Sequence, residues 1–443
     1  MTPAGALGLA VLWLSLAWAP APAAEMTTQI SAEPTAAVTA GTPAEKPDFP
    51  TWLAAFSRDA LARGIAQATL DAALGDVQPI PKVLELDRRQ PEFLDTFWNY
   101  LDARITPRQL KLGKDKLWIH RKLLGQVQRR QGVPAAVLVS LWGMETRYGA
   151  FTGGFPIPAA LATLAHDGRR ADFFRKELLD ALRILQDGHI AAADMKGSWA
   201  GAMGQMQFMP STFLEHAVDA DGDGRKDIWR SLPDALDSGA RYLQRVGWRQ
   251  DELWGREVRL PADFDHGLAT LGNKQPVNRW ANLGGALADG KPLPRSELPG
   301  AIVLPQGHAG PAFLVYRNFE AIMAWNRSVN YALSVALLAD RLRGQPPPMM
   351  GRDADNRRMG REDILEMQRL LSGRGFPTGD PDGVPGSRTR EAIRAFQNSA
   401  GLPVDGHASA TLLEHLRQEG QVHTQSVHAQ SVHTQSAAPV AAH

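Results

Sequence analysis

Apolar residues recur three or four positions apart through most of the chain after residue 48, and this spacing constrains the fold more than any other feature. The segments that show it most clearly are FPTWLAAFSRDALARGI (49–65), LWIHRKLLGQVQRRQG (117–132) and FEAIMAWNRSVNYALSVALLADRL (319–342). Side chains at this spacing lie on one face of an α-helix, and that face must be buried against another element. The sequence therefore predicts a mainly α-helical protein.

Two stretches interrupt the helical pattern and divide the chain. Residues 256–316 contain short apolar runs, AIVLP and PAFLVY, among Gly and Pro, which predict a small β-rich insertion. Residues 344–360, GQPPPMMGRDADNRRMG, are rich in Pro and charge and predict a linker. Because 443 residues exceed one ordinary core, we expect a main domain over 49–343 and a small three-helix domain over 361–417.

The two ends of the chain lack the pattern of a folded domain. Residues 1–24 hold a short apolar run followed by Pro and small residues, which is typical of a signal peptide, although no Lys or Arg precedes the run. An uncleaved anchor is the alternative, but the run is short for a bilayer span. Residues 25–48 are rich in Ala, Thr and Pro, and residues 418–443 repeat VHTQS, so both predict disordered segments. We therefore expect an exported, periplasmic protein.

Charge and cysteine content exclude several kinds of site. The formal net charge is +1, which argues against an electrostatic footprint for nucleic acid, so no nucleic-acid partner is expected. The chain has no cysteine, which excludes a disulfide, a thiolate metal site and a lipid anchor on cysteine.

A carboxylate continues an apolar helix face in the segment LVSLWGMETRYG, residues 138–149. Pro134 suits a first helical turn and Gly149 a helix end, and within this helix Leu138, Leu141 and Glu145 fall on one face. A carboxyl group held against Leu and Trp has a raised pKa, as a general acid working near neutral pH requires. The alternative is a solvated helix end at which Glu145 pairs with a neighbouring Arg.

Six fragments in a fixed order resemble the catalytic domain of the lytic murein transglycosylase B family. They are GVPAAVLVSLWGMETRYG, RRADFF, KGSWAGAMGQMQFMPSTF, DGDGRKDIW, DALDSGARYLQRVGW and NFEAIMAWNRSVNYALSVALLADRL. The resemblance implies a lysozyme-like catalytic core with an α-helical flank over 49–343. It also implies that Glu145, in the family's ETR(W/Y)G motif, is the sole catalytic acid and base.

The reaction implied is cleavage of a glycosidic bond without a hydrolytic water. Ordinary glycoside hydrolases use two carboxylates on either side of the bond. In the family's reaction the N-acetyl group of the muramic sugar assists departure and the sugar's own 6-hydroxyl closes onto C1. Glu145 would first protonate the leaving oxygen and then accept the proton of the 6-hydroxyl. The expected product is a 1,6-anhydromuramyl end, and no cofactor is needed for this chemistry.

The resemblance also assigns substrate-binding residues, each with a purely structural alternative. By motif position these are Ser198, Gln207, Arg169, Arg170, Tyr242, Trp325 and Asn326. Ser198 and Gln207 offer hydrogen bonds to the sugar, whereas the two arginines suit the carboxylates of the peptide stems. Trp325 departs from the family, which usually has Tyr before this Asn, so a role for the phenolic hydroxyl is lost.

The segment DADGDGRKDIWR, residues 219–230, resembles an EF-hand calcium loop up to its ninth position. Its twelfth position is Arg230 where a bidentate Glu is required, and Asp234 resembles the carboxylate of family members with a longer loop. The candidate ligands are Asp219, Asp221, Asp223, Arg225 through its carbonyl, Asp227 and Asp234. A structural Ca²⁺ ion and a turn satisfied by its own backbone both remain open.

The unit at 361–417 resembles the three-helix type of peptidoglycan-binding domain, through ILEMQRLLSGRGF, DGVPGSRTREAIRAFQNSAGLPVDG and ATLLEHL. The resemblance implies a tether that raises the local concentration of substrate. The alternative is a helical spacer without ligand affinity.

Three functions follow from these observations. The first is a lytic transglycosylase acting on peptidoglycan glycan strands, with cell-wall synthesis proteins as candidate partners. The second is a non-catalytic peptidoglycan-binding scaffold, which has no need of Glu145. The third is a lysozyme-type hydrolase that uses Asp167 or Asp172 as a second carboxylate and produces reducing ends.

Overall fold

The computed structural model describes residues 46–88 and 95–418, which divide into two compact units. The first unit contains residues 46–88 and 145–242, and the second contains residues 95–144 and 243–418. Helices α7 (Ala135–Thr146) and α11 (Leu232–Arg245) carry the chain from one unit to the other. The predicted signal peptide, most of the predicted N-terminal linker and the histidine-containing tail lie outside the described residues.

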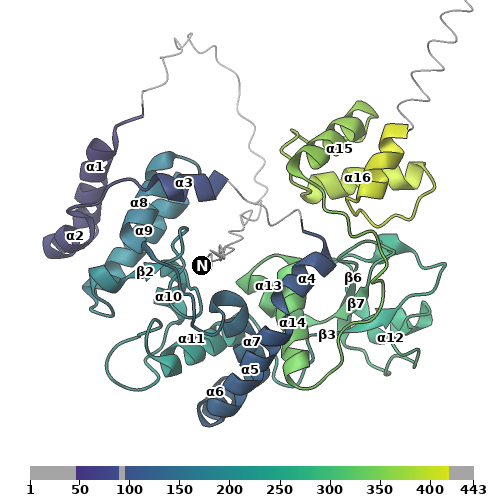
Figure 1. Ribbon diagram of the computed structural model, residues 1–443, viewed down its shortest axis with the longest axis horizontal. Helices are drawn as coiled ribbons and strands as arrows, with labels where there is room; N and C mark the ends of the chain where they lie inside the picture. The colour runs from purple at the N-terminus through teal and green to yellow at the C-terminus, as the bar shows by residue number, and fades with distance from the viewer. Residues whose placement is uncertain (1–45, 89–94, 419–443) are drawn as a thin grey trace, which may run out of the picture. The chain divides into compact units, whose positions relative to one another are not determined.

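The first unit is helical and is built around α8 (Ile157–Asp167) and α9 (Ala171–Gln186), which pack side by side (Figure 1). Every residue of α8 from Ile157 to Ala165 is buried, because this short helix is apolar on all its faces. The other elements are α1 (Phe49–Ala62), α2 (Gln67–Leu74), α3 (Pro81–Arg88), α10 (Pro210–His216), the 3₁₀ helix Ala192–Asp194 and the paired two-residue strands β1 (Phe155–Pro156) and β2 (Lys196–Gly197).

A buried carboxylate fixes the start of α10 in this unit. Glu177 on α9 is only 2% exposed. It accepts hydrogen bonds from the backbone N–H of Ser211 at 2.9 Å and from its hydroxyl at 2.6 Å. The first N–H groups of a helix have no partner within the helix, and a carboxylate also complements the positive end of the helix dipole. Glu177 therefore joins α9 to α10.

The second unit combines a helical part with a small antiparallel sheet. Its helices are α4 (Phe97–Arg104), α5 (Pro107–Ile119), α6 (Arg121–Gln131), the first ten residues of α7, α13 (Arg317–Trp325) and α14 (Val329–Leu342). Helix α14 packs against α4, α5 and α13. The hydroxyl of Ser140 on α7 donates to the carbonyl of Val335 on α14 at 2.6 Å, so this polar side chain is satisfied within the helical core.

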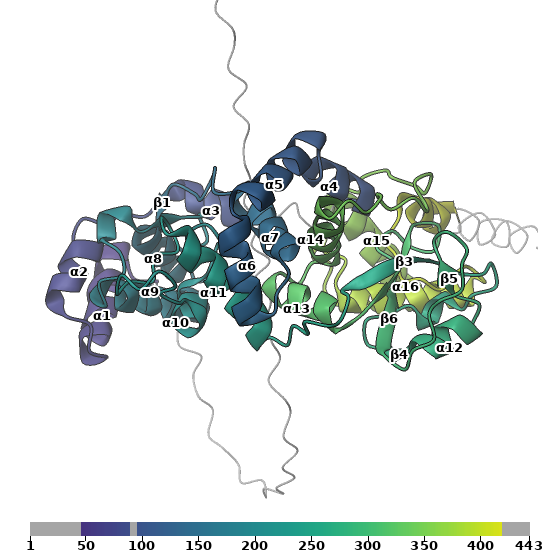
Figure 2. The ribbon, with the colours of Figure 1, turned by 90° about the horizontal axis from the view of Figure 1, so that it is seen from below.

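The sheet has the strand order β4-β6-β7-β3-β5, and each neighbouring pair is antiparallel. Figure 2 shows several of its strands beside α12. Its elements are β3 (Gly255–Arg259), the 3₁₀ helix His266–Leu268, β4 (Gln275–Pro276), α12 (Val277–Asn282), β5 (Ala286–Leu287), β6 (Pro299–Val303) and β7 (Ala312–Val315). Trp280 of α12 fills the core beneath the sheet and donates its indole N–H to the carbonyl of Gly300 at 2.8 Å. The predicted small β-rich insertion is thus present.

The C-terminal part of this unit has three helices, α15 (Arg361–Gly373), α16 (Ser387–Ser399) and a helical segment at 410–418. Two buried glutamines each close an Asp-Gly turn. Gln368 accepts the backbone N–H groups of Asp382 and Gly383, and its amide donates to the Asp382 carboxylate. Gln397 does the same with Asp405 and Gly406, although it accepts only from Gly406. The Gln and Asp-Gly motif of the sequence is therefore a structural device, and the predicted three-helix arrangement is confirmed.

Candidate active site

Glu145 is the penultimate residue of α7, a helix whose preceding turns are closely packed. Leu138 and Leu141, which share its face, are both fully buried, and Trp142 is 3% exposed. Glu145 itself is half-buried and Arg147 is exposed, so the buried helix meets solvent at this position. Such a boundary suits a group that exchanges a proton with a bound substrate.

The chain turns sharply after Glu145 through consecutive residues in left-handed conformations. Arg147 has φ 52°, Tyr148 φ 62° and Gly149 φ 80°. Non-glycine residues in this region each cost on the order of 1 kcal/mol, and such strain concentrates at functional sites. Thr146, 1% exposed, anchors the turn because its hydroxyl accepts the N–H of Gly149 at 3.0 Å. Burial raises the pKa of the Tyr148 phenol well above its usual value, so this hydroxyl stays protonated.

The turn is hydrogen-bonded to the loop that carries Ser198 and Gln207. The Thr146 hydroxyl donates to the carbonyl of Gln205 at 2.9 Å. The Gln207 amide donates to the carbonyl of Thr152 at 3.1 Å and to that of Gly204 at 2.9 Å. These bonds place the loop beside the turn that follows Glu145.

Gln207 presents an acceptor without a partner. It is 5% exposed and has φ 51°, the left-handed region again. Both amide hydrogens are used on backbone carbonyls, which fixes the orientation of the side chain. Its Oε1 atom is buried and has no hydrogen-bond partner among the described residues. A buried acceptor without a partner costs about 1–3 kcal/mol, so this oxygen is suited to receive a hydrogen bond from a ligand.

Ser198 has a different role within the same loop. Its side chain is 2% exposed, and its hydroxyl oxygen accepts the N–H of Ala202 at 2.9 Å. Its backbone N–H donates to the carbonyl of Ala202 at 2.8 Å, which closes the turn. The structural alternative for Ser198 therefore has direct support, while the hydroxyl proton remains available to a ligand.

Tyr242 lies on α11 and packs in an aromatic cluster of the first unit. Its ring contacts that of His216 edge-on, with centroids 5.0 Å apart, and lies 6.0 Å from that of Phe208. The side chain is half-buried. One part of the ring thus belongs to the core and another remains accessible.

Arg169 and Arg170 are both held by one buried carboxylate, Asp87. Asp87 is 2% exposed. Arg169 binds it through Nε at 2.7 Å and also donates to its backbone carbonyl at 2.8 Å, while Arg170 binds it through an Nη at 2.8 Å. The arginine side chains remain 48% and 28% exposed. Their primary contacts are therefore structural, and their binding of substrate stays a prediction.

Trp325 and Asn326 belong to the second unit, where they end α13. Asn326 is 6% exposed, and its side-chain Oδ1 accepts the backbone N–H of Ser328 at 3.0 Å. This bond shapes the connection from α13 to α14. Trp325 is half-buried.

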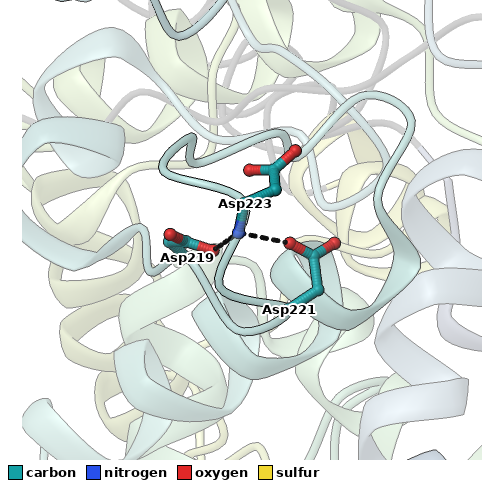
Figure 3. A group of neighbouring side chains, drawn as sticks. All are labelled: Asp219, Asp221 and Asp223. Carbon is teal, nitrogen blue, oxygen red and sulfur yellow. Dashed lines mark hydrogen bonds between the residues drawn. The ribbon is translucent and has the colours of Figure 1, made fainter.

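Three of the six predicted calcium ligands converge. Carboxylate oxygens of Asp219, Asp221 and Asp223 lie within 4.8 Å of one another, and all three residues are exposed. Figure 3 shows them around the backbone N–H of Asp223, which donates to Asp219 at 3.2 Å and to Asp221 at 3.4 Å. Desolvation raises the pKa of Asp219, but hydrogen bonds from the backbone N–H groups of Gly224, Gly222 and Asp223 outweigh it and lower the pKa overall. The Asp219 carboxylate is therefore ionised.

The other predicted ligands hold the loop in shape. Asp234 is fully buried and accepts the N–H groups of Ala220 and Asp227, both at 2.8 Å. Asp227 accepts the N–H groups of Trp229 and Arg230. Arg230, at the twelfth position, forms an ion pair with Asp194 at 3.0 Å. The oxygen-rich loop fits a hard cation through its first three aspartates, whereas Asp234 acts on the backbone of the loop.

Two site features were missed by sequence reasoning. Asp87 pairs with arginines 82 and 83 positions away, and no local pattern announces such a contact. Its spacing of four from the fully buried Val83 is the one available signal, since it places a carboxylate on an apolar face. Thr146 is the second feature: the sequence marks it only as part of the ETRYG segment, although its hydroxyl bonds this segment to the loop.

Comparison with known families matches both domains. A family model described as "Transglycosylase SLT domain" matches residues 48–340, and one described as "Putative peptidoglycan binding domain" matches residues 360–416. The membrane-bound lytic murein transglycosylase B of Escherichia coli is 32% identical over 242 residues, which are 53% of this chain and 64% of that protein. This chain therefore spans just under two thirds of that curated relative.

Solved structures agree with this assignment. SltB3 from Pseudomonas aeruginosa, in complexes with NAG-NAM-pentapeptide and with NAG-anhNAM-pentapeptide, is 46% identical with a TM-score of 0.81, covering 83% of this chain and 99% of SltB3. The lytic transglycosylase Slt35 of Escherichia coli, in complex with calcium, is 28% identical with a TM-score of 0.57, covering 68% of this chain and 94% of Slt35. These matches confirm the predicted family resemblance and fold class. Within residues 46–88 and 95–418, no helix is long and apolar enough to cross a membrane.

Proposed function

Because this chain belongs to the SLT transglycosylase family, we propose that it is a lytic transglycosylase that cleaves peptidoglycan. The bond cleaved is the β-1,4 linkage between N-acetylmuramic acid and N-acetylglucosamine. The product is a 1,6-anhydromuramyl end. A single carboxyl group, that of Glu145, acts first as acid and then as base.

The observation that carries this proposal is the position of Glu145. It ends a helix with a buried apolar face and precedes a strained turn that is hydrogen-bonded to the loop of Gln207. A carboxyl group in this position gives its proton to the leaving glycosidic oxygen as the bond to C1 breaks. The resulting carboxylate then accepts the proton of the 6-hydroxyl as that oxygen bonds to C1, so Glu145 ends the cycle protonated again.

Gln207 is the residue we assign to orienting the sugar. Its buried Oε1 accepts a hydrogen bond from an N-acetyl N–H or a hydroxyl group of the substrate, since its amide hydrogens are already used on the backbone. A fixed acceptor of this kind favours one orientation of the substrate over others.

The lysozyme-type alternative requires a second carboxylate beside the bond. One candidate, Asp167, already forms an ion pair with Arg88 at 3.1 Å. The other, Asp172, lies exposed in the first turn of α9. The ion pair disfavours Asp167 as a nucleophile, and the exposed position of Asp172 places it outside any enclosed site.

We assign the C-terminal domain the role of a peptidoglycan tether and the whole chain a periplasmic location. The tether keeps the catalytic domain near its polymeric substrate, which raises the effective substrate concentration. The location follows from the predicted signal peptide and from the cell-wall substrate. Cell-wall synthesis proteins remain candidate partners of the exported protein.

We also propose that Asp219, Asp221 and Asp223 hold a structural Ca²⁺ ion. Their convergent carboxylates supply oxygen ligands of the kind that Ca²⁺ prefers. The carbonyl of Arg225 is the further ligand expected from the seventh position of the loop. A bound ion would neutralise the repulsion among three exposed carboxylates and stiffen the loop between α10 and α11. The chemistry at Glu145 does not pass through it.

A digestion experiment separates the enzyme from the scaffold. Purified peptidoglycan is incubated with the wild-type protein, with Glu145→Gln and with Glu215→Gln, an exposed control on α10. Wild type and control are expected to release soluble muropeptides at equal rates, while the Glu145 variant binds the wall without releasing any. Equal release by the Glu145 variant, or none by the wild type, would remove the catalytic role of Glu145.

A further inference from the structure

A cavity of about 430 Å³ lies within the second unit, between the C-terminal domain and the segments that lead into α4 and α14. Its lining includes Thr96, Ser328 and Asn330 on one side and Arg390, Arg394 and His407 on the other. Cavities of this size are typical of small-ligand sites. The cavity involves none of the residues assigned to catalysis.

Two arginines on α16 face this cavity without a carboxylate partner. Arg390 and Arg394 are four residues apart and so lie on the same side of the helix. Neither forms an ion pair within residues 46–88 and 95–418, and the buried Nε of Arg394 has no hydrogen-bond partner there. Surrounding protein lowers the pKa of Arg390, and Arg394 lowers it further. The two positive charges therefore repel each other, and an anion bound in the cavity would relieve this repulsion.

The Arg394 side chain packs against the backbone of a neighbouring turn. A Cβ atom placed on Gly406, which has φ +69°, would lie 2.9 Å from the Nε of Arg394 and 3.0 Å from its Cζ. The guanidinium group thus packs directly on the backbone of Gly406, whose turn is itself closed by Gln397. A side chain at 406 would therefore require the Arg394 guanidinium group to shift.

Three of the carboxylates that line the cavity are already engaged by other groups. Asp405 accepts from His308, from the Gln397 amide and from the N–H of His407. Asp355 is bound by Arg357 and Thr411, and Asp95 by Arg358. Glu391 also lines the cavity, but it is exposed to solvent and forms no ion pair with either arginine within the described residues. None of them neutralises the arginine pair.

Two further features favour an anion. Helix α16 begins beside the cavity at Ser387, and its N-cap, Gly386, provides no side-chain hydrogen bond to the first turn. The positive end of a thirteen-residue helix therefore adds to the charge of the two arginines. Burial lowers the pKa of His407, and although Asp405 opposes this, Arg390 lowers it further, so the ring is a neutral hydrogen-bonding group.

We propose that this cavity binds a carboxylate group of a peptidoglycan peptide stem, with Arg390 and Arg394 as the residues that hold it. The choice of ligand rests on the proposed function, because the stem peptides are the anionic groups of the polymer that the chain would act on. Planar carboxylates match the donors of two guanidinium groups. The site would favour glycan strands that carry peptide stems. The C-terminal domain would then recognise the stem as well as tether the enzyme.

Binding is measured by calorimetry with full-length protein carrying Glu145→Gln, so that the glycan bond is not cleaved. The probes are a stem pentapeptide with a free C-terminal carboxylate, the same peptide with that terminus amidated, and inorganic phosphate. The variants are Arg390→Gln, Arg394→Gln and the charge-preserving Arg394→Lys, with Arg388→Gln as the control because Arg388 lies on the same helix outside the cavity lining. Thermal unfolding confirms that each variant is folded.

Loss of one charged hydrogen bond is expected to weaken binding by about tenfold or more. The Kd for the peptide should therefore rise at least about tenfold in Arg390→Gln and Arg394→Gln. It should rise less in Arg394→Lys and by under about twofold in the Arg388→Gln control. If the carboxylate that binds is the C-terminal one, amidation has the same effect as the Gln substitutions; if it is a side-chain carboxylate of the stem, amidation leaves Kd unchanged while the Gln variants still lose affinity.

Equal affinity in all variants, or no binding of the peptide, would overturn the proposal. Phosphate that binds in the cavity more tightly than the peptide would overturn the assignment to a carboxylate. The wild-type release of muropeptides is a separate readout. Weaker peptide binding in Arg390→Gln and Arg394→Gln, together with normal release by the wild type, supports both proposals. Absent release with arginine-dependent peptide binding would refute the proposed reaction alone.

Discussion

At the residue scale, Gln207 has a left-handed backbone conformation and a buried side-chain oxygen, Oε1, without a hydrogen-bond partner among the described residues. A residue with a purely structural role requires neither feature. Gln207→Ala removes two hydrogen bonds to backbone carbonyls and should lower the free energy of unfolding by about 1–3 kcal/mol. We expect muropeptide release to fall by at least about tenfold under conditions where the variant is fully folded, because the sugar loses its fixed acceptor.

Gln186→Ala is the matched control for this prediction, since Gln186 also bonds two backbone groups, those of Ala66 and Gly64. Urea unfolding and release of soluble product are measured on both variants. Equal loss of stability with activity retained in Gln207→Ala would show that Gln207 only shapes the loop.

Asp87 illustrates how one buried residue supports two exposed ones. Asp87→Asn leaves Arg169 and Arg170 without their shared carboxylate, and because both arginines are partly exposed, the expected loss is about 1–3 kcal/mol. Asp102→Asn, whose partner Arg352 forms an exposed pair, should change stability by less than about 0.5 kcal/mol. Chemical denaturation of the two variants compares them, and similar losses would mean that the buried clamp contributes nothing beyond a surface pair.

At the scale of the element, the loop between α10 and α11 should respond to calcium. Ca²⁺ at about a hundred times its Kd is expected to raise the Tm by roughly 5 °C relative to a chelator. Asp223→Ala should abolish this difference, whereas Asp251→Ala, at an exposed position outside the loop segment, should preserve it. Differential scanning calorimetry makes the comparison, and an unchanged Tm in the wild type would mean that the loop is satisfied by its own backbone.

Elements with a local cause were predictable from the sequence, and contacts between distant segments were not. The Asp-Gly calcium-type loop and the helix of Glu145 follow from spacing and turn residues within a few positions. The clamp of Asp87 and the cavity beside Arg390 join segments separated by tens of residues or more, for which one sequence carries no signal. Glu145 was found through its motif, since a single carboxylate on an apolar face left both a functional and a solvated interpretation open.

At the scale of the whole molecule, a titratable pair joins the C-terminal domain to the sheet-bearing part of its unit. His308 donates to Asp405 at 2.8 Å through both its ring and its backbone, and this bond raises the pKa of His308 above its usual value of 6.5. Burial opposes the shift, and the ring of His266, 5.6 Å away, adds no favourable charge.

Because the pKa of His308 is higher in the folded than in the unfolded protein, the pair contributes its full stability below pH 6.5. This contribution to the free energy of unfolding is lost as the pH rises through the pKa of the folded state. Wild type should therefore exceed His308→Gln in stability near pH 6 and match it near pH 9. A double-mutant cycle with Asp405→Asn, followed by urea unfolding at both values, measures the coupling. A coupling that grows with pH would contradict this account.

The central claim is that a single carboxyl group cleaves the glycan without water, and mass spectrometry of the released muropeptides tests it most directly. Peptidoglycan digested by the wild-type protein should yield ends lighter by one water than hydrolytic ends, and Glu145→Gln should yield none. Reducing ends from the wild type would contradict the claim, because they require a water molecule and a second group to activate it.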